Sequence, residues 1–316
     1  MNSYVQTLAV VVASISLGAC SVSAGPPIGA TQMKAAQTAP FGGPLVYVSD
    51  AGSNAVYVFP AGANNPVPVA KIAGFKTPDG LAVDADGNLF VANTNGRNVL
   101  AFKAGTTTLL RTLTYPGSDG PISLAFNPLG VLFVVNNRGL IAEYQPGSSS
   151  PSQTLDISQT TRITSMGQII FDSAGNLYAA LVPQLEKPAH VFKFAPGAKR
   201  GIDMRLEIRS NSTEPGLAID SKGNLYVGNY AHVDIFASGS RKATGHVGGT
   251  RSPNIVGFLT VGNSGDVYVA RRDTVGSGGV IDGFVLEFGP GGAPVIARIS
   301  KTINPIATAV SSAAPR

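Results

Sequence analysis

Residues 102–105, FKAG, end a short apolar run and belong to a pattern that the chain repeats. Each copy has an aromatic residue, two spacer residues and a glycine, and the six aromatic residues are Phe59, Phe102, Tyr144, Phe194, Phe236 and Phe288. Successive copies are 43, 42, 50, 42 and 52 residues apart. A period of this length, carried by strand-forming and turn-forming residues, is typical of repeated all-β units.

A second repeated stretch precedes the aromatic residue and is clearest at residues 80–93, GLAVDADGNLFVAN. It contains two short β-rich runs around a glycine turn, which is a hairpin signal. Equivalent stretches occupy residues 123–136, 168–181, 216–229 and 258–271. A third run ends at the aromatic residue, and a weaker fourth run follows the glycine turn. Four antiparallel strands per unit predict the blade of a β-propeller.

The two ends of the repeated region predict how the ring closes. The first unit starts at residues 45–50, LVYVSD, and lacks its innermost strand, whereas residues 305–310, PIATAV, resemble residues 78–83, PDGLAV, and have no blade of their own. An unclosed array would leave exposed strand edges. We therefore predict six blades over residues 44–311, with the C-terminal strand completing the first blade.

The N-terminal region predicts export. The first 33 residues carry no charged side chain, and the apolar run at residues 8–19 is short for a membrane span but suits a secretion signal. The sole cysteine, Cys20, follows LGA as in a bacterial lipobox, while residues 22–24, VSA, offer an ordinary cleavage site. We expect a signal peptide at 1–19, a tether at 20–43 after an acylated Cys20, and a tail at 312–316. The expected location is the bacterial cell envelope; a secreted or periplasmic soluble protein is the alternative.

Composition adds weaker constraints. Charged residues make up 13% of the chain, which is low for a soluble protein, and glycine (38) and proline (22) suit many tight turns. The net charge of +5 is by itself a weak argument for an anionic partner.

The repeat resembles the NHL-repeat propellers. The residues that carry the resemblance are 78–84 (PDGLAVD), 87–93 (GNLFVAN) and the aromatic–glycine turn. This resemblance implies a six-bladed ring over roughly residues 44–311. It does not imply one function, because such propellers include both binding modules and enzymes.

Strand order predicts which face carries the functional residues. The connections between second and third strands lie on one face, and the two long ones, at residues 181–189 and 271–283, are both there. Loops inserted on a rigid scaffold often carry function, although surface loops also drift in length. The candidate binding residues on this face are Asp50, Asp79, Asn93, Asn136, His190, Asn229, His232, Arg271 and Asp273.

Several of these candidates allow two interpretations. Five of the six residues that end the second strands are polar; the six are Asp50, Asn93, Asn136, Leu181, Asn229 and Arg271. Carboxylate and amide oxygens are suitable Ca²⁺ or Mg²⁺ ligands, but Asn and Asp also satisfy the backbone of turns. Together these residues favour a polar central pocket. His190 and His232 begin third strands on neighbouring blades, and a zinc site would need a further converging ligand, which His246 on an outer strand does not supply.

Asp79 has a resemblance of its own. The segment Pro78-Asp79-Gly80 is similar to the one that supplies a metal-binding aspartate in the gluconolactonase-like propellers, which implies a weak metal candidate at Asp79. The equivalent residues of the other blades are not ligands; they are Ile122, Gly167, Pro215, Gly257 and Ile306, and Glu214 is one residue out of register. The repeated tryptophan of virginiamycin-lyase-like propellers is absent, since the chain has no tryptophan.

These observations favour a non-enzymatic propeller that binds a protein, a small molecule or a polymer in the envelope. No cofactor is expected, although Ca²⁺ or Mg²⁺ remains open, and we expect a monomer that binds no nucleic acid. A metal-dependent lactonase-like or lyase-like enzyme that uses Asp79 and the asparagine ring is the alternative, and a purely structural envelope protein is a third. Basic residues on the outer strands of blades four and five form a solvated face or meet an anionic surface; they are Lys199, Arg200, Arg205, Arg209, Arg241, Lys242 and Arg251.

Overall fold

The computed structural model describes residues 41, 43–158, 163–183, 189–208, 215–228, 232–248, 254–275, 279–292, 294–302 and 304–311. The predicted signal peptide, Cys20, nearly all of the tether and the tail lie outside these residues. No helix within the described ranges is both long and apolar enough to cross a membrane.

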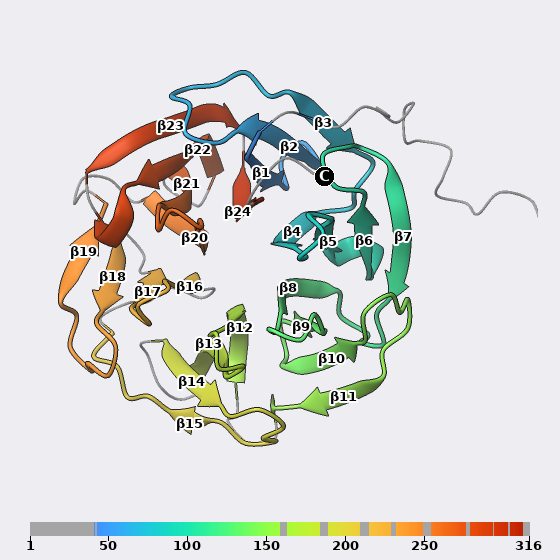
Figure 1. The fold of residues 1–316 in the computed structure, drawn as a ribbon, viewed down its shortest axis with the longest axis vertical. Coiled ribbons are helices and arrows are strands. Elements are labelled where there is room, and N and C mark those ends of the chain that lie inside the picture. The colour runs from blue at the N-terminus through green and yellow to red at the C-terminus, as the bar shows by residue number, and fades with distance from the viewer. Residues whose placement is uncertain are drawn as a thin grey trace, which may run out of the picture. The chain divides into compact units, whose positions relative to one another are not determined.

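The described strands form six four-stranded antiparallel sheets, arranged as blades around a central axis (Figure 1). This arrangement confirms the predicted six-bladed all-β fold. Two short 3₁₀ segments, η2 (Thr94–Gly96) and η3 (Pro290–Gly292), lie in connections.

From the axis outward, the strands of blades 1 to 3 are β24 (Pro305–Val310), β1 (Leu45–Asp50), β2 (Ala55–Pro60), β3 (Ala70–Ala73); β4 (Pro78–Val83), β5 (Leu89–Asn93), β6 (Asn98–Phe102), β7 (Leu109–Thr114); and β8 (Pro121–Phe126), β9 (Leu132–Asn136), β10 (Leu140–Tyr144), β11 (Gln153–Asp156). Those of blades 4 to 6 are β12 (Ile163–Phe171), β13 (Leu177–Pro183), β14 (His190–Phe194), β15 (Ile202–Asp203); β16 (Leu217–Ile219), β17 (Leu225–Gly228), β18 (Val233–Phe236), β19 (Gly245–Val247); and β20 (Asn254–Val261), β21 (Val267–Val275), β22 (Gly279–Phe288), β23 (Val295–Thr302).

The ring closes as the sequence predicts. β24 pairs antiparallel with β1, with Val310 opposite Val46 and Ala309 opposite Tyr47. Beyond the ladder, the backbone N–H of Ser311 donates to the carbonyl of Leu45 at 2.9 Å, and the N–H of Leu45 donates to the Ser311 hydroxyl at 3.0 Å. The two ends of the propeller are therefore joined within one sheet.

The hydrophobic core lies between blades. Among the described residues, the buried apolar side chains form six clusters; five combine residues of two neighbouring blades, and the sixth joins blades 1 and 2 with Phe258 of blade 6. Strands in this position are covered on both faces, and all five residues of β5 are buried. This double coverage explains why the strands are apolar without the alternation of a half-exposed sheet.

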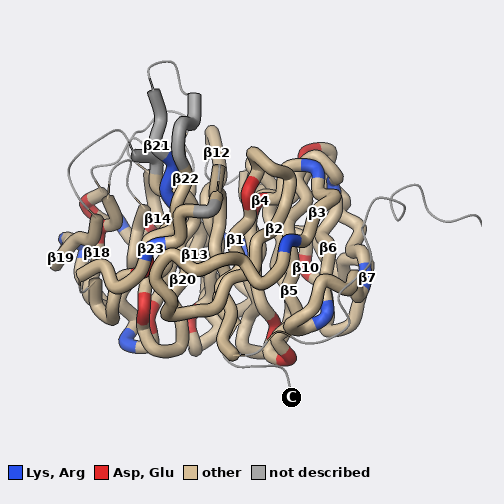
Figure 2. Tube along the Cα trace, turned by 90° about the horizontal axis from the view of Figure 1, so that it is seen from above, with Lys and Arg blue, Asp and Glu red and all other residues tan. Residues whose placement is uncertain are grey.

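Antiparallel pairing gives the ring two different faces. One, which we call the turn face, carries the connections between first and second strands and between third and fourth strands, such as residues 84–88 and 103–108. The other, the connection face, carries the connections between second and third strands and from blade to blade. On that face β21 and β22, of nine and ten residues, extend well beyond the equivalent five-residue strands β5 and β6 (Figure 2).

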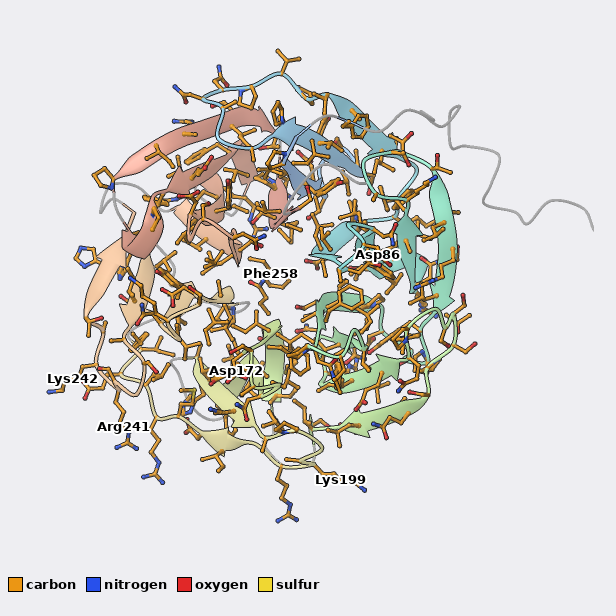
Figure 3. The ribbon with its side chains drawn as sticks, in the orientation of Figure 1. Asp86, Asp172, Lys199, Arg241, Lys242 and Phe258 are labelled. Carbon is orange, nitrogen blue, oxygen red and sulfur yellow. The ribbon has the colours of Figure 1, made fainter. Side chains whose placement is uncertain are left out.

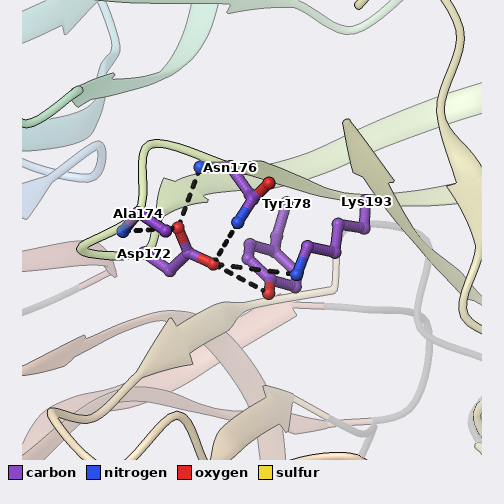
Figure 4. A network of polar contacts seen from close by, with 5 residues as sticks. All are labelled: Asp172, Ala174, Asn176, Tyr178 and Lys193. Carbon is purple, nitrogen blue, oxygen red and sulfur yellow. Dashed lines mark hydrogen bonds and ion pairs between the residues drawn. The ribbon is translucent and has the colours of Figure 1, made fainter. Parts of the chain in front are cut away.

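A repeated turn on the turn face fixes the first hairpin of several blades. In blade 4 the Asp172 carboxylate accepts the backbone N–H groups of Ala174 and Asn176 at 3.0 and 2.8 Å and the Asn176 side-chain amide at 2.7 Å (Figure 4). Gly175 provides the positive φ of +81° that this turn requires. Asp84 and Asp220 make the same three bonds in blades 2 and 5.

In blade 4 the same carboxylate has two further partners. Tyr178 donates its hydroxyl to Asp172 at 3.1 Å, and the Lys193 ammonium lies 3.8 Å away. Burial alone would raise the pKa of Asp172, but the hydrogen bonds from Asn176 and Tyr178 and the charge of Lys193 together hold that pKa below its ordinary value of 3.8.

The Asp172→Asn substitution should lower the free energy of unfolding at pH 7 by about 1–2 kcal/mol, because it weakens several hydrogen bonds to a charged acceptor. A carboxylate whose pKa is lowered by folding contributes stability that is complete above the unfolded pKa and disappears as the pH falls through the folded pKa. The difference from the unmodified protein should therefore narrow below about pH 4. Urea unfolding from pH 3 to pH 7 measures this, with Asp86→Asn in the exposed part of a similar turn as the control. If the difference in unfolding free energy between Asp172→Asn and the unmodified protein stayed constant from pH 3 to pH 7, it would contradict the lowered pKa of Asp172.

Candidate functional site

Three of the predicted strand-end residues bind backbone groups. Asp50 accepts the N–H groups of Ser53 and Asn304 at 2.9 and 3.3 Å. Asn93 accepts the N–H of Lys76 at 2.6 Å, and Asn136 accepts those of Arg138 and Leu140 at 3.1 and 2.9 Å. All three side chains are buried, so these oxygens hold the connections of the ring in place. This is the turn-stabilising interpretation that the sequence left open.

The remaining strand-end positions differ from one another. Leu181 is buried and apolar. Arg271 is 3% exposed and reaches toward blade 5, where a Cβ atom on Gly248 would lie 3.0 Å from its Nη1 atom and 3.8 Å from the His232 Cβ. Asp273 lies in β21 opposite Asp282 of β22. Asn229 lies outside the described residues.

The two histidines on the connection face each pair with an aspartate of their own blade. His190 Nδ1 lies 3.0 Å from Asp203 Oδ2 in blade 4, and His232 Nε2 lies 3.0 Å from Asp234 Oδ1 in blade 5. The ring of His246 is 5.9 Å from that of His232, measured between centroids. Within the described ranges no three His, Cys, Asp or Glu residues are placed to share a metal ion. The connection face of blades 4 and 5 therefore carries two histidine–aspartate contacts among the described residues.

The surroundings of Asp79 do not fit the metal site of gluconolactonase-like propellers. The equivalent position in blade 4 is Gly167, where a Cβ atom would lie only 2.3 Å from the carbonyl oxygen of Pro215. In blade 6 it is Gly257, where a Cβ atom would lie 2.4 Å from the carbonyl oxygen of Ile306. At both positions the inner strands touch backbone to backbone, so neither blade has space for a ligand side chain beside the axis.

Two side chains that sequence reasoning did not single out fill the central channel. Gln168, 9% exposed, donates from Nε2 to the carbonyl of Leu259 at 2.7 Å, and its Oε1 accepts the N–H groups of Leu217 and Leu259 at 2.9 and 2.8 Å. One side chain thus links the inner strands of blades 4, 5 and 6. Phe258 of blade 6 lies near the centre of the ring (Figure 3) and packs in the hydrophobic cluster of Leu81 and Ala307.

A signal for this plug was present in the repeat. At the equivalent position the other four blades have small residues, namely Gly80, Ser123, Gly216 and Ala307. Large residues at two of six equivalent positions beside the axis indicate side chains that fill the channel.

The central cavity lies at the turn-face end of the channel. It has a volume of about 270 Å³ and is lined by the last residues of the inner strands, including Val83, Phe126, Phe171, Ile219, Val261 and Val310. It is therefore at the opposite end of the channel from the polar residues that the sequence predicted to surround a pocket.

Comparison with known proteins agrees with this fold. Residues 42–138 match the family model of the SMP-30/Gluconolactonase/LRE-like region. No curated protein matches the chain. The predicted resemblance to this group of propellers is thus confirmed at the level of the fold, with a family match over β1 to β3 of blade 1, the whole of blade 2 and the first two strands of blade 3.

Three solved structures illustrate the likeness. A chain of the nidogen/laminin complex superimposes with a TM-score of 0.63 at 12% identity, covering 85% of this chain and 99% of that one. A Bacteroides caccae protein of unknown function has a TM-score of 0.60 at 13% identity, covering 84% and 98%. The U3-55K structure has a TM-score of 0.53 at 12% identity, covering 81% and 78%. At such identities the likeness concerns the fold alone.

Adding Ca²⁺, Mg²⁺ or Zn²⁺, or removing metal with EDTA, should change the melting temperature by less than about 1 °C, since a ligand stabilises only where the folded state binds it. Thermal unfolding followed by circular dichroism measures this. Asp79→Ala is compared with Asp86→Ala, which removes an exposed carboxylate elsewhere. The expectation would be contradicted if one ion raised the melting temperature by several degrees and if Asp79→Ala, but not Asp86→Ala, abolished that rise.

Proposed function

We propose that this protein is an exported, lipid-anchored binding scaffold that presents its connection face to a partner in the cell envelope. The observation that carries this proposal is the extension of β21 and β22 beyond the other blades on that face. Functional loops on rigid scaffolds commonly have this form. The closed ring supplies the rigid body, and the hairpin supplies a surface that the repeat itself does not need.

The polar groups beside this hairpin would provide specificity. His232 of blade 5 is within hydrogen-bond distance of Asp234, and both His232 and the Nη1 atom of buried Arg271 lie close to Gly248. In blade 4 the equivalent His190 is paired with Asp203 and is partly exposed. A partner that contacts blades 4 to 6 would therefore meet fixed donors and acceptors around a projecting edge. A protein, a small molecule or a polymer of the envelope would suit this surface.

Export and anchoring rest on the N-terminal sequence. The uncharged segment at residues 8–19 and Cys20 after Leu-Gly-Ala support a lipoprotein signal, and the residues between Cys20 and Phe41 would serve as the tether. The closed ring leaves only the short edges of its blades unpaired, which supports a monomeric propeller.

A metal-dependent lactonase-like or lyase-like enzyme is the second candidate. The match of residues 42–138 to the SMP-30/Gluconolactonase/LRE-like model supports it. The backbone contacts at Gly167 and Gly257 oppose it, because they leave no space for the ligands that the other blades would supply.

A photo-crosslinking amino acid at position 275, at the end of β21, should yield one reproducible adduct in intact cells, because this position lies on the projecting edge. The same amino acid at position 86, exposed on the turn face, should not yield that adduct. Gel shift and mass spectrometry of the purified adducts provide the measurement. Absence of any specific adduct at position 275, or the same adduct at both positions, would overturn the proposal.

A further inference from the structure

The turn face of blades 3 to 5 combines exposed basic residues with an exposed leucine. Lys199 and Arg200 follow the aromatic–glycine turn of blade 4, and Arg241 and Lys242 occupy the same place in blade 5. Lys222 lies in the first turn of blade 5, and all five side chains are exposed. Because their turns all connect first to second or third to fourth strands, they share one face of the ring.

The ion pairs of the described residues do not join these cations to a carboxylate, although the exposed Glu207 lies beside Arg241, whose carbonyl accepts the Glu207 N–H at 2.8 Å. Asp172 and Asp220 accept hydrogen bonds from their own turns, and the ion pairs found among the described residues include none of the five basic side chains. Figure 3 shows Lys199, Arg241 and Lys242 on the rim of blades 4 and 5, whereas the exposed Asp86 belongs to blade 2. Five exposed basic side chains therefore gather on the turn face of blades 4 and 5.

The apolar element lies beside this sector. Leu129, in the first turn of blade 3, is 81% exposed. It borders a cavity of about 350 Å³ that is lined mainly by apolar side chains, including Phe133, Leu155 and Phe194, with Lys199 and Glu143 also in the lining. An exposed leucine at a turn tip and a lysine thus meet at one apolar depression.

The chain also enters the propeller on this face. The N–H of Phe41 donates to the carbonyl of Gly105 in the third-to-fourth-strand turn of blade 2 at 2.7 Å, and the N–H of Ala61 donates to the carbonyl of Pro44 at 3.0 Å. Cys20 precedes Phe41 by 21 residues. The segment that follows the lipid anchor proposed at Cys20 would therefore join the propeller on the face that carries Leu129 and the basic residues.

We propose that the turn face of blades 3 to 5 docks on an anionic lipid bilayer, with Leu129 entering the interface and the five basic side chains contacting phosphate headgroups. Lysine and arginine beside an anionic membrane are attracted by its surface potential, and an apolar side chain adds burial at the headgroup boundary. The cations come from three separate turns of two blades and do not converge on one point. That spread suits an extended anionic surface better than a single small anion.

The first test uses Leu129→Trp, which introduces the only tryptophan of the chain and so a unique fluorescent reporter. In the full-length protein, its emission should shift to shorter wavelength with vesicles containing phosphatidylglycerol, and brominated lipids should quench it. Vesicles of phosphatidylcholine alone should produce a much smaller change. An unchanged spectrum with anionic vesicles would overturn the proposal, as would an equal shift with both vesicle types.

The second test separates the basic sector from net charge. Arg241→Glu/Lys242→Glu is compared with Lys76→Glu/Arg97→Glu, which makes the same change of charge on the connection face. Each charge removed from the docking sector should weaken vesicle binding about fivefold, and the reversal should weaken it further. Vesicle cosedimentation at low and moderate salt measures this. Equal loss in the two variants would contradict docking by this face. The proposal would also be overturned if the protein bound an acidic polypeptide through Arg241 and Lys242 while the residue at position 129 did not enter the bilayer. That result would identify a protein partner.

Discussion

The pairing of β24 with β1 is the constraint on which the remaining structure depends. It joins the last described strand to the first and holds six inner strands around one axis. Close to the axis these strands approach one another so tightly that a Cβ atom at Gly167 or Gly257 would contact a neighbouring carbonyl at less than 2.5 Å. The closure therefore determines which side chains the channel can hold. Gln168 and Phe258 occupy that space, and Gln168 connects three blades through backbone groups that burial would otherwise leave without water.

Closure also gives the two faces different freedom to vary. On the turn face, Asp84, Asp172 and Asp220 bind the N–H groups of their own short turns, so each hairpin is fixed locally. Variation there is limited to the side chains that point outward, such as Leu129 and the basic pairs. On the connection face, strands can lengthen without disturbing the ring, as β21 and β22 do. This difference supports separate roles for the two faces, one toward a membrane and the other toward a partner.

The sequence predicted the fold well because its signals are local and repeated. Short-range preferences of the chain determine the aromatic–glycine turn and the hairpin around Gly87. The aromatic–glycine turn occurs six times, which makes the repeat unambiguous, and the unpaired strand at residues 305–310 indicates how the ring closes. The candidate site was less predictable. An aspartate or asparagine at a strand end has the same sequence signature whether it binds a ligand or a backbone N–H. The structure is needed to show that Asp50, Asn93 and Asn136 accept hydrogen bonds from backbone N–H groups. Gln168 acts on residues 49 and 91 positions away, which no local pattern reveals.

Labelling of lysines in the vesicle-bound, full-length protein tests the assignment of the two faces most directly. An amine-reactive reagent and mass spectrometry would compare Lys199, Lys222 and Lys242 on the turn face with Lys76 on the connection face, all of which are exposed in the free protein. The account predicts that anionic vesicles protect the first three lysines several-fold and leave Lys76 fully reactive. Equal protection of all four lysines, or protection of Lys76 alone, would contradict it.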